Sequence, residues 1–299
     1  MVTQAAHAGA TRWIDIKVHN GHLLIESEVA GISGYSIIDT GAQLNAINEA
    51  FIEAEKLSFK KARSVKIRGV VGESLRSTYR EIPVVVFGAP LNFKRLVEID
   101  LGSPEIQLIL GASFIENYVF QLDYPNERLR LITRDSVDLE AIKNVESKKD
   151  PEGGSPLVKV GLSEDTDAWL TMDTGATGGI LIDRDLAGRL EWIDTFPKLE
   201  STVSGVISSG QMEHFNVPGV QLGPFRIERP IVSIPVFGES FELFETRTPL
   251  GTRISSRSTS KGLLGYNILK HFVVTVDYKA GHVHIYPGEK EADESQTGD

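Results

Sequence analysis

The sequence predicts an all-β protein, mainly β with short helices, made of two copies of one folding unit. Three observations predict this class. Most segments outside a few helix-like stretches are short and alternate apolar with polar residues, which is typical of antiparallel strands. Turn residues separate these segments at close intervals, as in barrels and sandwiches. An internal repeat also covers most of both halves of the 299-residue chain.

Each copy of the repeat contains the same elements in the same order. Its first part reads YSIIDTGAQLNAINEAFIEAEKLSF from Tyr35 and AWLTMDTGATGGILIDRDLAGRLEW from Ala168. In both, an apolar strand precedes Asp-Thr-Gly-Ala, and a short segment and then an amphipathic stretch suited to a helix follow. Its second part reads LILGASFIENYVFQLDYPNERLRLI from Leu108 and GLLGYNILKHFVVTVDYKAGHVHIY from Gly262. Here a glycine and a short helix precede a strand, Asp-Tyr, a turn and a final strand.

The remaining strands are predicted from alternation alone. The segments RWIDIKV, HLLIESEV, REIPVVVF and KRLVEID belong to the first half, and PLVKVGL and PIVSIPVF to the second. Each half should therefore form a small, mostly β lobe.

The spacing of the repeated motifs indicates whether the two halves are copies of one unit or are similar by coincidence. Asp39 and Asp173 are 134 positions apart, whereas Asp123 and Asp277 are 154 apart. About 20 extra residues therefore lie within the second copy. The segment 243–262, rich in Ser, Thr and Arg and without strand alternation, is the expected place for them.

The domain boundaries follow from the repeat and from composition. We expect an N-terminal lobe over 12–134, a linker over 135–156 and a C-terminal lobe over 157–288. The linker passes from a helix-like segment into a charged stretch rich in Pro and Gly. The acidic, polar segment 289–299 is expected to be a flexible tail.

Composition and charge exclude several function classes. The formal net charge is −10 and no dense run of Lys or Arg occurs, which disfavours binding to nucleic acid or anionic lipid. The chain has no cysteine, so disulfides, thiol nucleophiles and Cys-ligated zinc are excluded. No apolar run is long enough for a membrane span, and the first residues lack the pattern of a secretory signal. The expected partner is a protein or peptide.

The two Asp-Thr-Gly-Ala turns point to chemistry. An aspartate directly after an apolar strand is partly desolvated, and a glycine two residues later permits a tight turn around its carboxylate. One such turn is an ordinary structural sequence. Two turns at equivalent places in a repeat would meet where the halves pack together. Two carboxylates that share a site hold one proton between them, so the pair can act as base and acid on one bound water.

These motifs resemble those of retropepsin-like aspartic peptidases, here in tandem. The resemblance is carried by both Asp-Thr-Gly-Ala turns, by Leu110-Gly111 and Leu264-Gly265, and by the Asp-Tyr strands. It implies the bilobal aspartic-protease fold, with two pseudo-twofold-related barrels and a cleft between them. The motif resembles that of the retroviral enzymes, which use two identical chains, whereas the layout in one chain resembles that of pepsins.

The resemblance also implies roles for individual residues. Asp39 and Asp173 would be the catalytic pair, Thr40 and Thr174 would interlock beneath them, and Gly41 and Gly175 would shape the turns. Gly111 and Gly265 would lie in the strand-helix segments that pack behind these turns. Ala42 and Ala176 follow the glycines where pepsins often have Ser or Thr. Because alanine cannot donate a hydrogen bond to a catalytic carboxylate, the pair should titrate higher than in pepsin.

The family also has glycine-bearing hairpin flaps that close over the substrate. The candidate flaps are 67–74 in the first half and 203–211 in the second, about 30 residues after each turn. Neither contains the tyrosine of the pepsin flap, so two smaller flaps are expected. Their central residues are Gly69, Val70, Val71 and Gly72, and Gly205, Val206 and Ile207.

The expected function is that of an aspartic endopeptidase acting on an extended protein or peptide substrate, with a monomer sufficient for activity. No cofactor and no metal are expected, because His282 and His284 share a strand face but have no third ligand in the sequence. The alternatives are a non-catalytic peptide-binding or scaffold protein of the same fold, and an assembly factor whose aspartates serve stability. The compartment is not fixed by the sequence. The resemblance favours a bacterial periplasmic or secreted protein over a cytoplasmic one.

Overall fold

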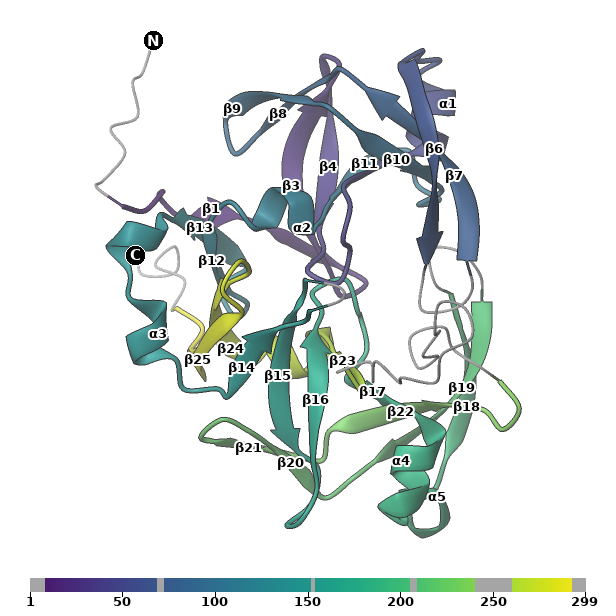
Figure 1. The fold of residues 1–299 in the computed structure, drawn as a ribbon, viewed down its shortest axis with the longest axis vertical. Coiled ribbons are helices and arrows are strands. Elements are labelled where there is room, and N and C mark those ends of the chain that lie inside the picture. The colour runs from purple at the N-terminus through teal and green to yellow at the C-terminus, as the bar shows by residue number, and fades with distance from the viewer. Residues whose placement is uncertain (1–8, 69–72, 152–153, 205–208, 240–259, 292–299) are drawn as a thin grey trace, which may run out of the picture.

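The computed structural model describes residues 9–68, 73–151, 154–204, 209–239 and 260–291 of the chain (Figure 1). Strands make up 51% of the structure and helices, all of them short, 12%, so the prediction of a mainly β protein is confirmed. Within these described ranges the strands form two ten-stranded sheets and one five-stranded sheet. In the described part of the chain, no helix combines the length and apolar character needed to cross a membrane.

The first large sheet is built from the first half of the chain and lies at the top of Figure 1. Its order is β6-β7-β10-β5-β11-β4-β3-β8-β9, and β2 pairs with β3. The strands are β2 (Lys17–His19), β3 (His22–Val29), β4 (Ile32–Ile38), β5 (Ala46–Asn48), β6 (Lys60–Arg68), β7 (Glu73–Arg80), β8 (Ile82–Val86), β9 (Ala89–Phe93), β10 (Leu96–Ile99) and β11 (Ile106–Leu110).

The second large sheet lies at the bottom of Figure 1 and repeats this order strand for strand. Its order is β18-β19-β22-β17-β23-β16-β15-β20-β21, and β14 pairs with β15. The strands are β14 (Ser147–Lys149), β15 (Pro156–Gly161), β16 (Asp167–Met172), β17 (Ile180–Ile182), β18 (Leu199–Ser204), β19 (Ser209–Asn216), β20 (Gly219–Leu222), β21 (Phe225–Glu228), β22 (Ile231–Pro235) and β23 (Gly262–Leu264). The repeat in the sequence is therefore a repeat in topology.

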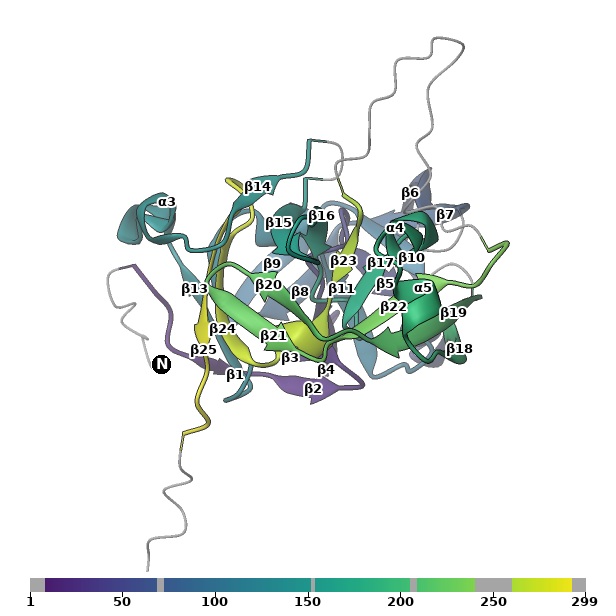
Figure 2. The same ribbon diagram turned by 90° about the horizontal axis from the view of Figure 1, so that it is seen from below.

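The five-stranded sheet joins the two halves and lies to one side of both large sheets (Figures 1 and 2). Its order is β1-β13-β12-β24-β25. At its centre β12 and β24, equivalent strands of the repeat, pair antiparallel over five residues each. The strands are β1 (Ile14–Asp15), β12 (Val119–Asp123), β13 (Arg128–Ile132), β24 (Phe272–Asp277) and β25 (His282–Pro287).

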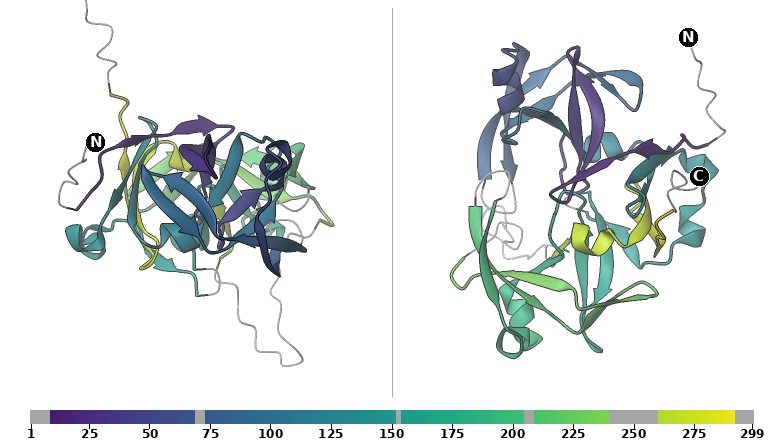
Figure 3. Two further views of the ribbon diagram at one scale, coloured as in Figure 1. Left: turned by 90° about the horizontal axis from the view of Figure 1, so that it is seen from above. Right: turned by 180° about the vertical axis from the view of Figure 1, so that it is seen from behind.

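The same arrangement of three paired strands lies at the centre of each large sheet. In the first sheet β11 lies between β4 and β5, parallel to β4 and antiparallel to β5. In the second, β23 lies in the same way between β16 and β17. Asp39 follows β4 and Asp173 follows β16, so the two aspartates leave equivalent strands, and the two halves face each other in Figure 3.

The helices are short and lie at strand ends. They are α1 (Glu49–Ala54), α2 (Ala112–Ile115), α3 (Leu139–Ile142), α4 (Arg184–Arg189), α5 (Trp192–Thr195) and α6 (Tyr266–Leu269), with a 3-10 turn over Arg134–Ser136. Asn48 caps α1 and Asp183 caps α4 through their side chains, which satisfies a free N–H in each first turn. Both helices lie in the stretches predicted as helical, and a short strand, β5 or β17, directly precedes each of them.

One apolar core runs through all three sheets. Leu23, Leu110 and Phe120 from the first half are buried in the same cluster as Leu170 and Val274 from the second. A separate, smaller cluster lies on the other face of the first sheet and includes Leu24, Ile37, Ala46, Val97, Ile99 and Ile109. We call this smaller group the outer-face cluster.

Two segments differ from their predicted roles. Residues 147–149 of the expected linker form β14 and pair with β15, so this part belongs to the second sheet. The first residues of the expected flexible tail are held: Glu291 donates its N–H to the Asn126 side chain and forms an ion pair with Arg128. Composition alone indicated a loop in both places, because neither segment has strand alternation or apolar residues to bury. Most of the predicted insertion 243–262 lies outside the described residues.

Candidate functional site

Asp39 and Asp173 are fixed at equivalent strand ends. The N–H of Asp39 donates to the Leu110 carbonyl at 3.1 Å, and the N–H of Asp173 donates to the Leu264 carbonyl at 2.9 Å. Leu110 and Leu264 are the last residues of β11 and β23. In each large sheet, the last residue of the central strand therefore fixes the backbone of one aspartate by a hydrogen bond.

The two threonines join the turns across the halves. The Thr40 hydroxyl donates to the Met172 carbonyl at 2.8 Å and accepts the Thr174 N–H at 2.9 Å. Reciprocally, the Thr174 hydroxyl donates to the Ile38 carbonyl at 2.8 Å and accepts the Thr40 N–H at 3.0 Å. Both threonines are 1% exposed. Four buried hydrogen bonds thus fix the relative position of the two aspartates.

Each carboxyl group lies against the glycine of the opposite turn. A Cβ built on Gly41 would lie 2.5 Å from Cγ of Asp173, and one built on Gly175 would lie 2.5 Å from Oδ2 of Asp39. Contacts that short do not occur for real side chains, so only glycine fits at either position. The carboxyl groups of Asp39 and Asp173 are brought together at this point.

The two carboxyl groups differ in their surroundings. Oδ1 of Asp39 accepts the N–H groups of Gly41 at 2.8 Å and Ala42 at 3.0 Å, and Asp39 is partly exposed. Asp173 is 8% exposed and accepts the Gly175 N–H at 2.8 Å. Burial, followed by the charge of Asp39, raises the pKa of Asp173 well above its usual range, and the Gly175 N–H opposes this. Asp173 is therefore suited to keep a proton.

The glycine of each apolar-Gly motif packs behind one turn. The Ala42 carbonyl accepts the N–H of Ala112, and the Ala176 carbonyl accepts the N–H of Tyr266, both at 2.8 Å. A Cβ on Gly111 would lie 2.6 Å from the Ala42 oxygen, and one on Gly265 would lie 2.5 Å from the Ala176 oxygen. The first residues of α2 and α6 thus support the turns from behind, where the resemblance implied these glycines.

The predicted flaps are only partly described. The hairpin β6–β7 flanks residues 69–72, and the hairpin β18–β19 flanks residues 205–208. The central flap residues named from the sequence, Gly69 to Gly72 and Gly205 to Ile207, lie outside the described residues. Val65 and Ile67 of β6 pack against the outer-face cluster, as does Ala42. The first hairpin therefore shares an apolar surface with the turn that carries Asp39.

A tyrosine that sequence reasoning gave no role supports the first turn. Tyr278, 1% exposed, donates its hydroxyl to the Thr40 carbonyl at 2.6 Å and lies 3.0 Å from the Ser155 hydroxyl. Its repeat equivalent, Tyr124, is also buried, but its hydroxyl has no hydrogen-bond partner among the described residues. Burial raises the pKa of both tyrosines. The repeated Asp-Tyr pair was the signal that could have pointed to them.

The turn between β2 and β3 is a second feature missed from the sequence. A Cβ on Gly21 would lie 2.9 Å from Cβ of Thr177, so this turn touches the segment after Gly175. Burial lowers the pKa of His22, and the charge of Asp39 opposes the shift. Gly21 of this turn and His22 at the start of β3 therefore lie near the two Asp-Thr-Gly-Ala segments.

Replacing Tyr278 with phenylalanine is expected to lower the free energy of unfolding by about 1 to 3 kcal/mol, because the buried Thr40 carbonyl loses its donor. Tyr124→Phe is the matched control and should change it by less than about 0.5 kcal/mol, since no protein partner is lost. Urea denaturation of both variants measures the difference. Equal effects of the two substitutions would show that the hydroxyl of Tyr278 does not brace the turn.

Asp123 and Asp277, the other aspartates of the repeat, make contacts that stabilise hairpins. Asp277 accepts the N–H groups of Lys279 and Ala280 and pairs with Arg134. Asp123 pairs with Arg128 at 2.9 Å. His284 lies 2.7 Å from the Ile142 carbonyl through Nδ1, and the described ranges contain no group of three residues suited to hold a metal ion.

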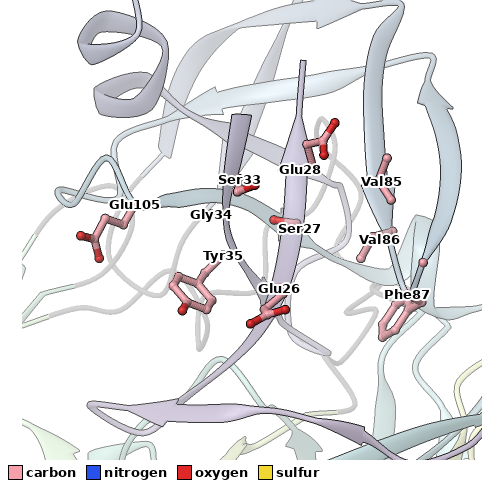
Figure 4. Close-up of a pocket in the computed structure, with 11 residues that line it drawn as sticks. Glu26, Ser27, Glu28, Ser33, Gly34, Tyr35, Val85, Val86, Phe87 and Glu105 are labelled. Atoms are coloured by element: carbon pink, nitrogen blue, oxygen red, sulfur yellow. The ribbon is translucent and has the colours of Figure 1, made fainter. Parts of the chain in front are cut away.

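A cavity of about 780 Å³ lies elsewhere, on the first sheet beside β3, β4 and β8 (Figure 4). Glu26, Glu28 and Glu105 line it, and neither Asp39 nor Asp173 does. No protein-family model matches the chain, and a search of curated proteins finds no match.

Proposed function

We propose that the protein is an aspartic endopeptidase that hydrolyses peptide bonds between Asp39 and Asp173. The observation that carries the proposal is the reciprocal hydrogen bonding of Thr40 and Thr174, which brings the carboxyl groups of two repeat units together. A single Asp-Thr-Gly turn could be structural. Two such turns, locked to each other with both carboxyl groups adjacent, supply the base and the acid that hydrolysis of an amide requires.

The surroundings of the two carboxyl groups suit different roles. Asp39, whose Oδ1 accepts two N–H groups, is the base that takes a proton from a water bound between the carboxyls. The oxygen of that water adds to the peptide carbonyl carbon while Asp173, whose pKa burial raises, gives its proton to the carbonyl oxygen. Asp39 then passes its proton to the departing nitrogen as the C–N bond breaks and Asp173 recovers a proton from the diol.

In this proposal the chain has the bilobal aspartic-protease fold, with each half a retropepsin-like lobe. The substrate lies extended in a cleft between the lobes and is held by main-chain hydrogen bonds. The hairpins β6–β7 and β18–β19 act as two flaps. Because one chain supplies both aspartates, a monomer is sufficient for activity.

Cleavage of a peptide library between about pH 3 and pH 8, with and without a statine-type inhibitor, tests this function. We expect inhibitor-sensitive cleavage in weakly acidic to neutral solution, because the raised pKa of Asp173 lets it keep its proton as the pH rises. Activity should fall at higher pH when Asp173 loses that proton. An optimum below about pH 3, where pepsin-like values operate, would contradict the role of Asp173.

If the protein cleaves no peptide of the library, the proposed peptidase activity is wrong. Binding of library peptides without cleavage would favour a non-catalytic peptide-binding protein of the same fold.

A further inference from the structure

Charge is strongly segregated along the chain. Ten of the 31 Lys and Arg residues, but only two of the 41 Asp and Glu residues, lie between positions 56 and 95. This stretch therefore has a formal charge of +8, and the remainder of the chain has −18. It contains β6, β7 and the turn that precedes β10, which are neighbours at one edge of the first sheet. We call this edge the basic edge.

The cations of the basic edge lie side by side. Lys60 and Arg80 are direct partners across β6 and β7, and like charges placed opposite each other are unfavourable. Arg95, which immediately precedes β10, reaches the Arg63 carbonyl with its guanidinium at 3.2 Å. In the register of β7 with β10, Arg95 falls next to Arg80. Three strands therefore place Lys60, Arg80 and Arg95 in one row.

Few carboxylates neutralise this surface. Lys60 pairs with Glu81 and Lys66 pairs with Glu73. Within the ranges that the structure describes, no carboxylate lies at ion-pair distance from Lys61, Arg80 or Arg95, and all three are exposed. The surface thus has surplus positive charge on a protein that is acidic as a whole.

Arg76 of β7 is the residue of the basic edge that shares a sheet face with the outer-face cluster. It lies directly opposite Val65 in the hairpin, so both side chains are on one face of the sheet. Val65 packs against the outer-face cluster, as does Ala42, which follows the Asp39 turn. Nε of Arg76 is buried and has no hydrogen-bond partner among the described residues. A cation with an unused donor is therefore on the same sheet face as the apolar surface that reaches the Asp39 turn.

On the face of the first sheet that carries the outer-face cluster, the charge changes from one strand to the next. Leu24 belongs to the outer-face cluster, and Glu26 and Glu28 follow on the same side of β3. These glutamates line the cavity in Figure 4. The face is thus basic at β7, apolar in the middle and acidic at β3, so an acidic ligand is drawn to the β6–β7 side.

We propose that the basic edge binds acidic side chains of a polypeptide, so that the preferred substrates carry Asp or Glu beside an apolar segment. The proposal rests on the proposed peptidase function, because it places that polypeptide at the dyad. A polypeptide fits better than nucleic acid: Tyr79, the aromatic residue of the described hairpin strands, is 7% exposed and offers no stacking surface for bases. The charge of −18 on the rest of the chain also repels a phosphate backbone.

Binding to the inactive Asp39→Asn protein tests the proposal without cleavage. The probes are a fluorescent peptide with an apolar pair flanked by Glu residues and the same peptide with Gln in place of Glu. We expect the Glu peptide to bind roughly tenfold more tightly at low salt, with the difference shrinking as salt is added. Arg76→Gln, Arg80→Gln and Arg95→Gln together should abolish this preference, and Arg→Lys at the same sites should restore part of it.

Lys143→Gln with Lys279→Gln is the control, since both lysines are exposed and lie outside the basic edge. It should keep the preference. Equal binding of the two peptides, or an equal loss in the control, would overturn the proposal. So would a single-stranded DNA oligonucleotide or an anionic vesicle that binds more tightly than the Glu peptide through the same arginines. Failure of the peptidase function would appear separately, as absence of cleavage by the wild-type protein.

Discussion

Changing Gly175 to alanine is expected to lower kcat/KM by about 100-fold or more. The new Cβ would lie 2.5 Å from Oδ2 of Asp39, so the carboxyl group or the turn must move. A displacement of about 1 Å at a reacting group costs on the order of 100-fold in rate. Gly41→Ala should act in the same way on Asp173, because its Cβ would lie 2.5 Å from Cγ of that residue. Steady-state kinetics on a cleaved library peptide measures both effects.

Gly178→Ala is the matched control in the same segment. Among the described residues other than its two chain neighbours, no atom lies within 4 Å of a Cβ built on Gly178, and its φ is not in the left-handed region. Its kcat/KM should remain within about threefold of wild type, because it changes neither packing nor the turn. Thermal unfolding should show a loss for Gly175→Ala, since overpacking of a close site costs about 1 to 3 kcal/mol. Wild-type activity in Gly175→Ala would show that the carboxyl of Asp39 is not held at this point.

The repeat is the part of the fold that the sequence predicts best. Asp-Thr-Gly-Ala occurs twice, and each copy has an apolar strand before it and an apolar-Gly motif after it, so local patterns specify the same strands in both halves. The identical strand orders of the two large sheets follow from this. The same pattern placed Thr40 and Thr174 at equivalent positions, and the structure joins them by hydrogen bonds.

Contacts between distant segments could not be predicted in this way. The pairing of β12 with β24 joins residues such as Gln121 and Thr275, which are 154 positions apart. Alternation shows that both are strands but not which edges meet. The hydroxyl of Tyr278 reaches Thr40 across 238 positions, whereas that of its equivalent Tyr124 has no hydrogen-bond partner in the described part of the chain. Symmetry in the sequence therefore does not guarantee symmetry in the contacts.

The basic edge is another feature that local patterns in the sequence did not predict. Lys and Arg never occupy more than two consecutive positions in the sequence. The positive charge is instead spread over two strands and a turn that pair side by side. A register shift between Ala62 and Val65 also changes which side chains share a face, and alternation along one strand does not reveal it.

In the proposed mechanism Asp39 and Asp173 act as one unit on one water molecule. The most direct test is kcat/KM for Asp39→Asn, Asp173→Asn and the double variant, each shown to be folded. We predict that each single substitution lowers kcat/KM by about 1,000-fold or more and that the double variant is no worse, because residues that act as a unit are not additive. A single variant within about tenfold of wild type, or losses that multiply in the double variant, would contradict a shared catalytic pair.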